Sequence, residues 1–259
     1  EPYLRGSVPF DGIYSLIARL WQPDSILEID EKNYLSFSPR LIRFGSSGLA
    51  GVWAEENTRD SIYNAFRRKE AFGTSGPRIK VRFFAGYNFE NSNLNDQDLI
   101  QEAYSKNVPM GGDIIQEKGK NPRFLVWAIS DPLGAPLQRL QIIKGWLEDG
   151  EQREKVFDVA CSDGLSVDPI THRCPDNEAL VNLDDCSIST DKGNSEIKTF
   201  WKDPEFNQDQ DSFYYSRVLE NPSCRWSTWD AIREGEKPRS DIPITIQERA
   251  WSSPIWFTQ

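Results

Sequence analysis

Hydrophobic and polar residues alternate in short runs over most of the second half of the chain, which is the pattern of half-buried β-strands. Turn residues separate these runs, and 138–160 has the pattern of a hairpin, with Glu148 to Glu151 as its turn. The runs lie at 78–84, 124–130, 138–147, 155–160, 197–201, 213–219 and 254–258. About seven such strands predict an immunoglobulin-like antiparallel β-sandwich.

The stretch before the first of these strands has a helical period instead. Asn57 with Asp60 three residues later predicts a capped helix start, and Arg67 to Lys69 suit the negative end of the helix dipole. Apolar residues at helical spacing predict one buried face, made of Ile62, Tyr63, Ala65 and Phe66. We expect a strand over 49–53, a short amphipathic helix over 13–21, and a surface connection over 90–120 with a helical turn at 96–105.

The net charge of the chain limits the classes of molecule that it is expected to bind. The 259 residues include 40 acidic and 30 basic side chains, giving a net charge of −10. This balance argues against nucleic acid or an anionic membrane surface as the main partner, and no apolar run approaches a membrane span. The chain starts at Glu1 with neither an initiator Met nor a signal peptide, so we expect a processed, trimmed or partial product.

The four cysteines all lie in the second half of the chain, and four cysteines allow three pairings. We favour Cys161 with Cys174 and Cys186 with Cys224, because the first pair closes a short loop. A zinc site is the alternative, weakened by the lack of a CxxC pair and by a single histidine, His172. Two disulfides predict an oxidising compartment, periplasmic or secreted.

Five collinear stretches resemble one protein family: SGLAGVWAEENTRDSIYNAFRRKEAFGTSGPRIKVRFF, FLVWAISD, LQIIKGW, FYYSRVLE and QERAWSSPIWF. They look like the signature of the domain-of-unknown-function family 3604, whose members are mostly exported bacterial proteins related to the PHP (polymerase and histidinol phosphatase) hydrolases. The resemblance covers almost everything from residue 41 onward. It implies a distorted β/α barrel holding two or three divalent metal ions (Zn, Mn or Fe), which would activate water to cleave an ester of phosphate or sulfate.

This chain departs from that pattern in one respect. The family's histidine-rich metal motifs lie upstream of GVWAEEN, whereas His172 is the only histidine here, so we expect no metal site within this chain alone. The resemblance therefore implies a C-terminal portion of a metal-dependent hydrolase. Its residues 1–77 would be the last strand and helix of a PHP-like barrel, and residues 78–259 a β-sandwich. The partners implied are an upstream part of the same protein or a second chain carrying the metals, and a small-molecule ester substrate.

Candidate site residues follow from this barrel interpretation. Glu55, Glu56, Asn57, Thr58 and Arg59 would end a barrel strand and begin a helix, at the catalytic mouth of such a fold. Backbone donors at the helix start and the Arg59 guanidinium suit a phosphate or sulfate group. The structural alternative is that the acids only complement the helix dipole and that Arg59 pairs with a surface acid. Thr74, Ser75 and Arg78 form a second candidate group, with a tight turn as its alternative.

Two further features have both a functional and a structural interpretation. The acidic loops 163–168 and 182–185 are candidate calcium loops, but they lack the helix–loop–helix spacing of an EF-hand, so we favour solvated turns. Trp226 and Trp229 near Arg225 are a candidate sugar-stacking platform. The structural alternative is that their large rings fill the core or a domain interface. The sequence thus supports two hypotheses, a portion of an exported ester hydrolase and a non-catalytic binding or assembly module acting alone.

Overall fold

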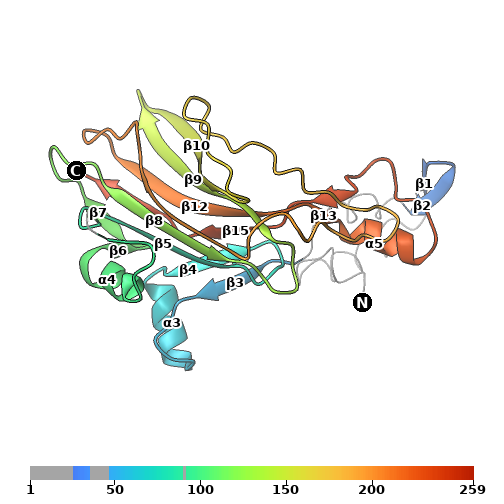
Figure 1. Ribbon diagram of the computed structural model, residues 1–259, viewed down its shortest axis with the longest axis horizontal. Helices are drawn as coiled ribbons and strands as arrows, with labels where there is room; N and C mark the ends of the chain where they lie inside the picture. Colours follow the sequence, from blue (N-terminus) through green and yellow to red (C-terminus); the bar gives the residue numbers. More distant parts are fainter. Residues whose placement is uncertain (1–25, 36–46, 90–91) are drawn as a thin grey trace.

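Two antiparallel sheets packed face to face form the body of the protein in the computed structural model, which describes residues 26–35, 47–89 and 92–259 (Figure 1). The larger sheet has the strand order β10-β9-β12-β15-β4-β3, and β16 joins it by pairing with both β12 and β7. Its strands are β3 (Leu49–Val52), β4 (Ala71–Thr74), β7 (Asp113–Ile115), β9 (Leu137–Glu148), β10 (Glu151–Cys161), β12 (Ser212–Glu220), β15 (Arg249–Ser252) and β16 (Ile255–Thr258). All of its pairings are antiparallel except that of β16 with β7.

The smaller sheet has the order β11-β8-β5-β6. Its strands are β5 (Lys80–Gly86), β6 (Val108–Pro109), β8 (Arg123–Ile129) and β11 (Glu196–Lys202). Two short hairpins lie outside both sheets, formed by β1 (Ile26–Ile29) with β2 (Lys32–Leu35) and by β13 (Ser223–Cys224) with β14 (Thr245–Ile246). The three helices in the described residues are α3 (Arg59–Arg67), α4 (Leu99–Lys106) and α5 (Trp226–Arg233).

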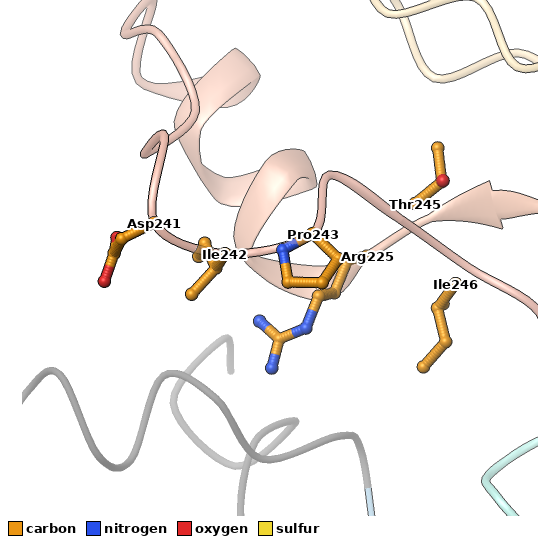
Figure 2. Close-up of a pocket in the computed structure, with 6 residues that line it drawn as sticks. All are labelled: Arg225, Asp241, Ile242, Pro243, Thr245 and Ile246. Atoms are coloured by element: carbon orange, nitrogen blue, oxygen red, sulfur yellow. The ribbon is translucent and has the colours of Figure 1, made fainter.

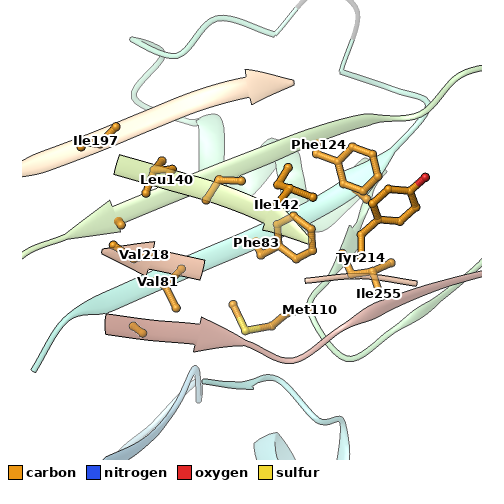
Figure 3. Close-up of a cluster of buried hydrophobic side chains, with 14 of the residues drawn as sticks. Val81, Phe83, Met110, Phe124, Leu140, Ile142, Ile197, Tyr214, Val218 and Ile255 are labelled. Carbon is orange, nitrogen blue, oxygen red and sulfur yellow. The ribbon is translucent and has the colours of Figure 1, made fainter. Parts of the chain in front are cut away.

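The core lies between the two sheets, where alternate residues of each strand meet (Figure 3). Val81, Phe83 and Phe124 of the smaller sheet face Leu140, Ile142 and Val218 of the larger one, and all are fully buried. A second, smaller cluster on the other side of the smaller sheet holds α4 in place through Phe84, Leu99 and Ala103. The alternation in sequence therefore marks one shared core, as expected of a sandwich.

The predicted strands and the 138–160 hairpin are confirmed, and so is a helix within 96–105. The chain is mainly β, with antiparallel sheets; the finer prediction of an immunoglobulin-like arrangement stays a prediction. The structure adds nine elements that the sequence patterns do not predict, namely β1, β2, β4, β6, β7, β13, β14, β15 and α5. The helix expected over 13–21 lies outside the described residues.

The expectation of a barrel strand over 49–53 is corrected. Barrel strands run parallel, whereas β3 pairs antiparallel with β4, and β4 pairs antiparallel with β15 in the larger sheet. No closed barrel occurs in the part of the chain that the structure describes. The domain boundary predicted after residue 77 lies between β4 and β5, which belong to the two sheets of the sandwich.

Helix α3 also differs from its prediction. Thr58, not Asn57, is the N-cap, because its Oγ1 accepts a hydrogen bond from the Ser61 backbone N–H at 3.3 Å. Among the four predicted buried residues only Ala65 is buried, while Tyr63 and Phe66 are 59% and 49% exposed. The helix projects away from the sheets (Figure 1), so only its base meets the rest of the described fold.

Candidate functional site

The five predicted site residues lie together at the exposed start of α3. Glu55, Glu56, Asn57, Thr58 and Arg59 are all exposed. The Ser61 hydroxyl donates to a Glu55 carboxylate oxygen at 3.0 Å and accepts from the Glu56 backbone N–H at 3.2 Å. The pKa of Glu55 is lowered, chiefly because its own backbone N–H bonds to the carboxylate and then because Ser61 does. These contacts cap the helix and assemble no enclosed site.

Glu55 of this set lines a hollow of about 320 Å³ at the base of α3. There Arg68 pairs with Glu55 at 3.1 Å and with Glu70 at 3.4 Å. The Arg82 guanidinium lies 3.6 Å from the centre of the Trp53 ring and donates to the Tyr104 hydroxyl at 2.9 Å.

Tyr104 in turn donates to the buried carboxylate of Glu70. Burial, followed by this contact with Glu70, raises the pKa of Tyr104 to about 12. Every charged group of the pocket thus has an ionic or hydrogen-bonding partner within it. This arrangement is suited to fastening α3 and α4 to β5.

The second predicted group leads to a different part of the fold. Ser75 follows β4 and donates a hydrogen bond to a carboxylate oxygen of Glu248, while its hydroxyl accepts from the Arg249 backbone N–H at 2.8 Å. Arg78 donates its backbone N–H to Asp131 at 2.7 Å. Thr74 is buried, and its hydroxyl accepts from the Gly76 N–H at 3.3 Å, as in the predicted turn. Of these three, Ser75 reaches a cluster of buried ionisable groups.

That cluster is built around Glu220 and Glu248, which we call the carboxyl pair. Glu220 ends β12 and Glu248 precedes β15, and the Glu220 N–H donates to the Glu248 carbonyl at 3.0 Å. Burial raises the pKa of Glu220 to about 8, helped by the negative charges of Glu248 and Asp131. Burial likewise raises the pKa of Glu248, against the opposing effect of the Ser75 hydrogen bond. Two acids with shifted pKa values at one place are typical of a functional site, although structural networks also produce them.

Arg225 brings a buried positive charge to the same end of the sandwich. It precedes α5 and lines a pocket of about 450 Å³ together with Asp241, Ile242, Pro243, Thr245 and Ile246. In Figure 2 its side chain projects from the start of α5 into the space between Ile242 and Ile246. Nη1 donates to the Ser227 hydroxyl at 2.8 Å. Burial lowers the pKa of Arg225, and the charge of Glu248 works against that shift.

The described residues do not fit the multinuclear metal centre that the family resemblance implies. Within the ranges that the structure describes, no group of three or more His, Cys, Asp or Glu side chains is placed to hold a metal ion. The His172 ring packs edge-on against Phe157, with centroids 5.2 Å apart. In the candidate calcium loops at 163–168 and 182–185, Asp168 accepts from the Thr171 N–H at 2.7 Å and Asp185 from the Ser187 N–H at 2.9 Å, both in local turns, whereas Asp163 accepts from the distant Gly193 N–H at 2.8 Å.

The predicted disulfides are confirmed as Cys161–Cys174 and Cys186–Cys224. All four cysteines are therefore oxidised, which indicates a non-cytoplasmic setting. No helix among the described residues is long and apolar enough to cross a membrane.

The tryptophans of α5 form no open platform. Trp226 and Trp229 are both half-buried, and Arg225 and Arg233 lie 5.3 Å from their respective ring centres. Sequence reasoning singled out Arg225 only for its place beside them, and it did not find the carboxyl pair. Glu220 ends an alternating strand and Glu248 lies in the stretch QERAW, so neither has a local pattern that marks a buried acid. Only the pairing of β12 with β15 brings them together.

One family model matches residues 22–259, and its description is a protein of unknown function, DUF3604. A search of curated proteins finds no match to this chain.

Proposed function

We propose that this chain, which belongs to the DUF3604 family, is the C-terminal portion of an exported metal-dependent hydrolase of phosphate or sulfate esters. In this proposal an upstream part of the protein, or a second chain, carries the divalent metal ions and the barrel. The present chain supplies the β-sandwich and a wall of the substrate pocket. Its periplasmic or secreted location belongs to the same proposal.

The buried guanidinium of Arg225 in its pocket is the observation that carries the proposal. A guanidinium binds phosphate or sulfate oxygens through paired, charge-assisted hydrogen bonds. These bonds strengthen where water is excluded, and Arg225 is 4% exposed. Thr245 lines the same pocket and adds a hydroxyl for a further ester oxygen. Ester binding by Glu55 through Arg59 stays a prediction, whereas this proposal gives the role of anion-binding residue to Arg225.

The test uses the full-length protein with its upstream region, loaded in turn with Zn, Mn and Fe. Hydrolysis of p-nitrophenyl phosphate and p-nitrophenyl sulfate is measured for the wild type and for Arg225→Ala. Loss of a charge-assisted hydrogen bond should lower kcat/KM by about 10- to 100-fold. Arg239→Ala is the matched control, because Arg239 is a buried arginine of the same region that pairs with Asp241 and does not line the pocket.

Equal activity losses in the two variants, in step with equal losses of thermal stability, would assign Arg225 a structural role only. A full-length protein that binds no divalent metal and cleaves neither ester would overturn the proposal as a whole.

The alternative function, a non-catalytic module acting alone, is favoured by the lack of a metal-ligand cluster among the described residues. The intact mass of the purified material under denaturing, non-reducing conditions, with metal analysis of the same sample, separates the two. A single metal-free species of this chain's mass that is folded and monomeric supports the module. A heavier species, or a second polypeptide carrying metal, supports the hydrolase.

A further inference from the structure

The outer face of the larger sheet carries a row of side chains that crosses five strands. The strand register aligns Asp113 of β7, Trp256 of β16, Phe213 of β12, Gly145 of β9 and Glu154 of β10. Neighbouring residues on the same strands, such as Phe257 and Tyr214, are fully buried between the sheets. Because successive side chains of a strand point to opposite faces, the row points away from the core.

Aromatic rings lie flat on this face. A Cβ atom at Gly145 would come within 2.3 Å of the Phe213 ring, so the absence of a side chain there lets the ring lie on the strand beside it. The Phe213 and Trp256 ring centres are 4.9 Å apart, and Trp256 is 43% exposed. Tyr215 continues the surface, with its ring 6.5 Å from that of Phe213 and nearly parallel to it. We call Phe213, Tyr215 and Trp256 the aromatic platform.

Phe213 and Trp256 of the platform border a groove of about 1120 Å³ whose charged lining residues are mostly acidic. The strands that form its floor, β9, β10 and β12, run side by side in Figure 1. Its carboxylates belong to Glu148, Asp149, Glu154, Asp209 and Asp211. The one arginine lining the groove, Arg153, pairs with Glu148 at 3.3 Å. The groove therefore combines flat aromatic faces with many hydrogen-bond acceptors and an excess of negative charge.

We propose that this groove binds a neutral oligosaccharide or polysaccharide chain. The C–H face of a sugar ring packs on the electron-rich face of an aromatic side chain, and the sugar hydroxyls donate to the surrounding carboxylates and amides. Anionic ligands are repelled by the negative charge of the groove. An apolar helix would cover these carboxylates without giving them donors, which is costly. A sugar chain supplies both kinds of contact, because its C–H faces pack on the aromatic platform and its hydroxyl groups donate to the carboxylates of the groove.

The first measurement is affinity electrophoresis through gels containing soluble neutral polysaccharides, namely a β-glucan, a xylan, a galactomannan and starch, with heparin as the anionic comparison. The wild type should be retarded by at least one neutral polymer and not by heparin. Trp256→Ala should weaken that binding by about tenfold or more, equivalent to one lost stacking contact. Tyr63→Ala is the control, because Tyr63 is an exposed ring on α3, away from the groove.

A second variant perturbs the platform without removing a ring. Gly145→Ala would displace Phe213 from the sheet and should weaken glycan binding by about tenfold. Gly51→Ala is matched to it, because a Cβ there meets the Phe72 ring at the same 2.3 Å in the same sheet, away from the groove. We expect Gly51→Ala to retain binding.

The proposal is overturned if no neutral polymer retards the folded wild type, or if heparin retards it more strongly. It is also overturned if the wild type self-associates in sedimentation and Trp256→Ala abolishes that association, because the platform would then be an interface between copies of the chain. Equal binding by the Gly145→Ala and Gly51→Ala variants would overturn the platform geometry. Hydrolysis of p-nitrophenyl esters should be unchanged in all these variants, so the groove can fail or succeed independently of the proposed ester hydrolase.

Discussion

A buried acid lies near each end of strand β12, and the two acids have opposite kinds of partner. Near the first end, Asp203 accepts from the Lys144 ammonium and from the Tyr214 hydroxyl, each at 2.7 Å. The Glu205 backbone N–H donates to its other carboxylate oxygen at 2.8 Å. Burial raises the pKa of Tyr214, and the charge of Asp203 adds to that rise. This acid is buried with donors on both of its oxygens.

At the other end, Glu220 is equally buried, but among the described residues no ion pair joins it to a cation. The Ala135 N–H supports its carboxylate, whereas Oε1 has no hydrogen-bond partner there. Burial, and after it the negative charges of the neighbouring Glu248 and Asp131, raises the pKa of Glu220 to about 8. The comparison shows that burial alone does not set the state of an acid. The partners decide whether it stabilises the fold as an ion or holds a proton at neutral pH.

The largest expected loss of stability comes from removing the cation that pairs with Asp203. Lys144→Met leaves the Asp203 charge buried without its cation, and should lower the free energy of unfolding by about 3–5 kcal/mol. Urea denaturation at pH 7 measures this difference. Lys106→Met is the control, since Lys106 pairs with Glu102 at 3.0 Å on the exposed face of α4. The control should change stability by less than about 1 kcal/mol, and equal losses would contradict the comparison.

The second prediction concerns Glu220, whose contribution to stability depends on pH. Between its ordinary pKa and a folded pKa of about 8, Glu220 keeps its proton in the folded state and loses it in the unfolded state. Stability should therefore fall as pH rises through this window, by up to about 1.4 kcal/mol per pH unit from this group. Glu220→Gln, which stays neutral, should remove that slope and raise stability at pH 8, with little change at pH 4.

Thermal unfolding of wild type and Glu220→Gln across pH 4 to 9 measures the difference between their slopes. Asp203→Asn sharpens the contrast, because it removes a paired charge and should destabilise the protein across the neutral range. A Glu220→Gln variant that is destabilised equally at every pH would show that Glu220 is ionised in the folded protein.

The smallest effect is expected at Ser75. Ser75→Ala removes a hydroxyl donor from Glu248, whose pKa is already raised by burial, and should raise that pKa further. The loss in stability at pH 7 should be about 1–2 kcal/mol, and smaller at pH 4, where Glu248 is protonated with or without the donor. Denaturation at both pH values measures it. An equal loss at both would assign the effect to the Arg249 N–H, which also bonds to this hydroxyl at 2.8 Å.

Most of the β-structure could be predicted from the sequence because its signals are local. The 138–160 hairpin follows from alternation on both sides of a turn, and the register of β9 with β10 agrees with it. The disulfide pairing was also predictable, since the short loop between Cys161 and Cys174 favoured that bond and left one other. The buried face assigned to α3 was wrong, because helical spacing shows which residues share a face and not whether another element covers it.

The site at the end of the sandwich was less predictable. Arg225 was noted only for its neighbouring tryptophans, and Ser75 only as part of a turn. Glu220 ends β12 and Glu248 precedes β15, so the pairing of these two strands brings the buried Glu220 beside the half-buried Glu248. The aromatic platform has the same origin, since Phe213, Trp256 and Gly145 meet only through the register of three strands.

The sequence by itself thus determined the strand-rich class, the main hairpin, the two disulfides and the family, because periodicity, turn residues and collinear motifs are properties of neighbouring residues. Only the tertiary structure decided that β3 and β4 belong to the sandwich, which acids are buried with a cation, and which rings lie together on the outer face. Those outcomes depend on non-local strand pairing, which sets the dielectric environment and the partners of each side chain. A residue's chemistry is fixed by those surroundings as much as by its type.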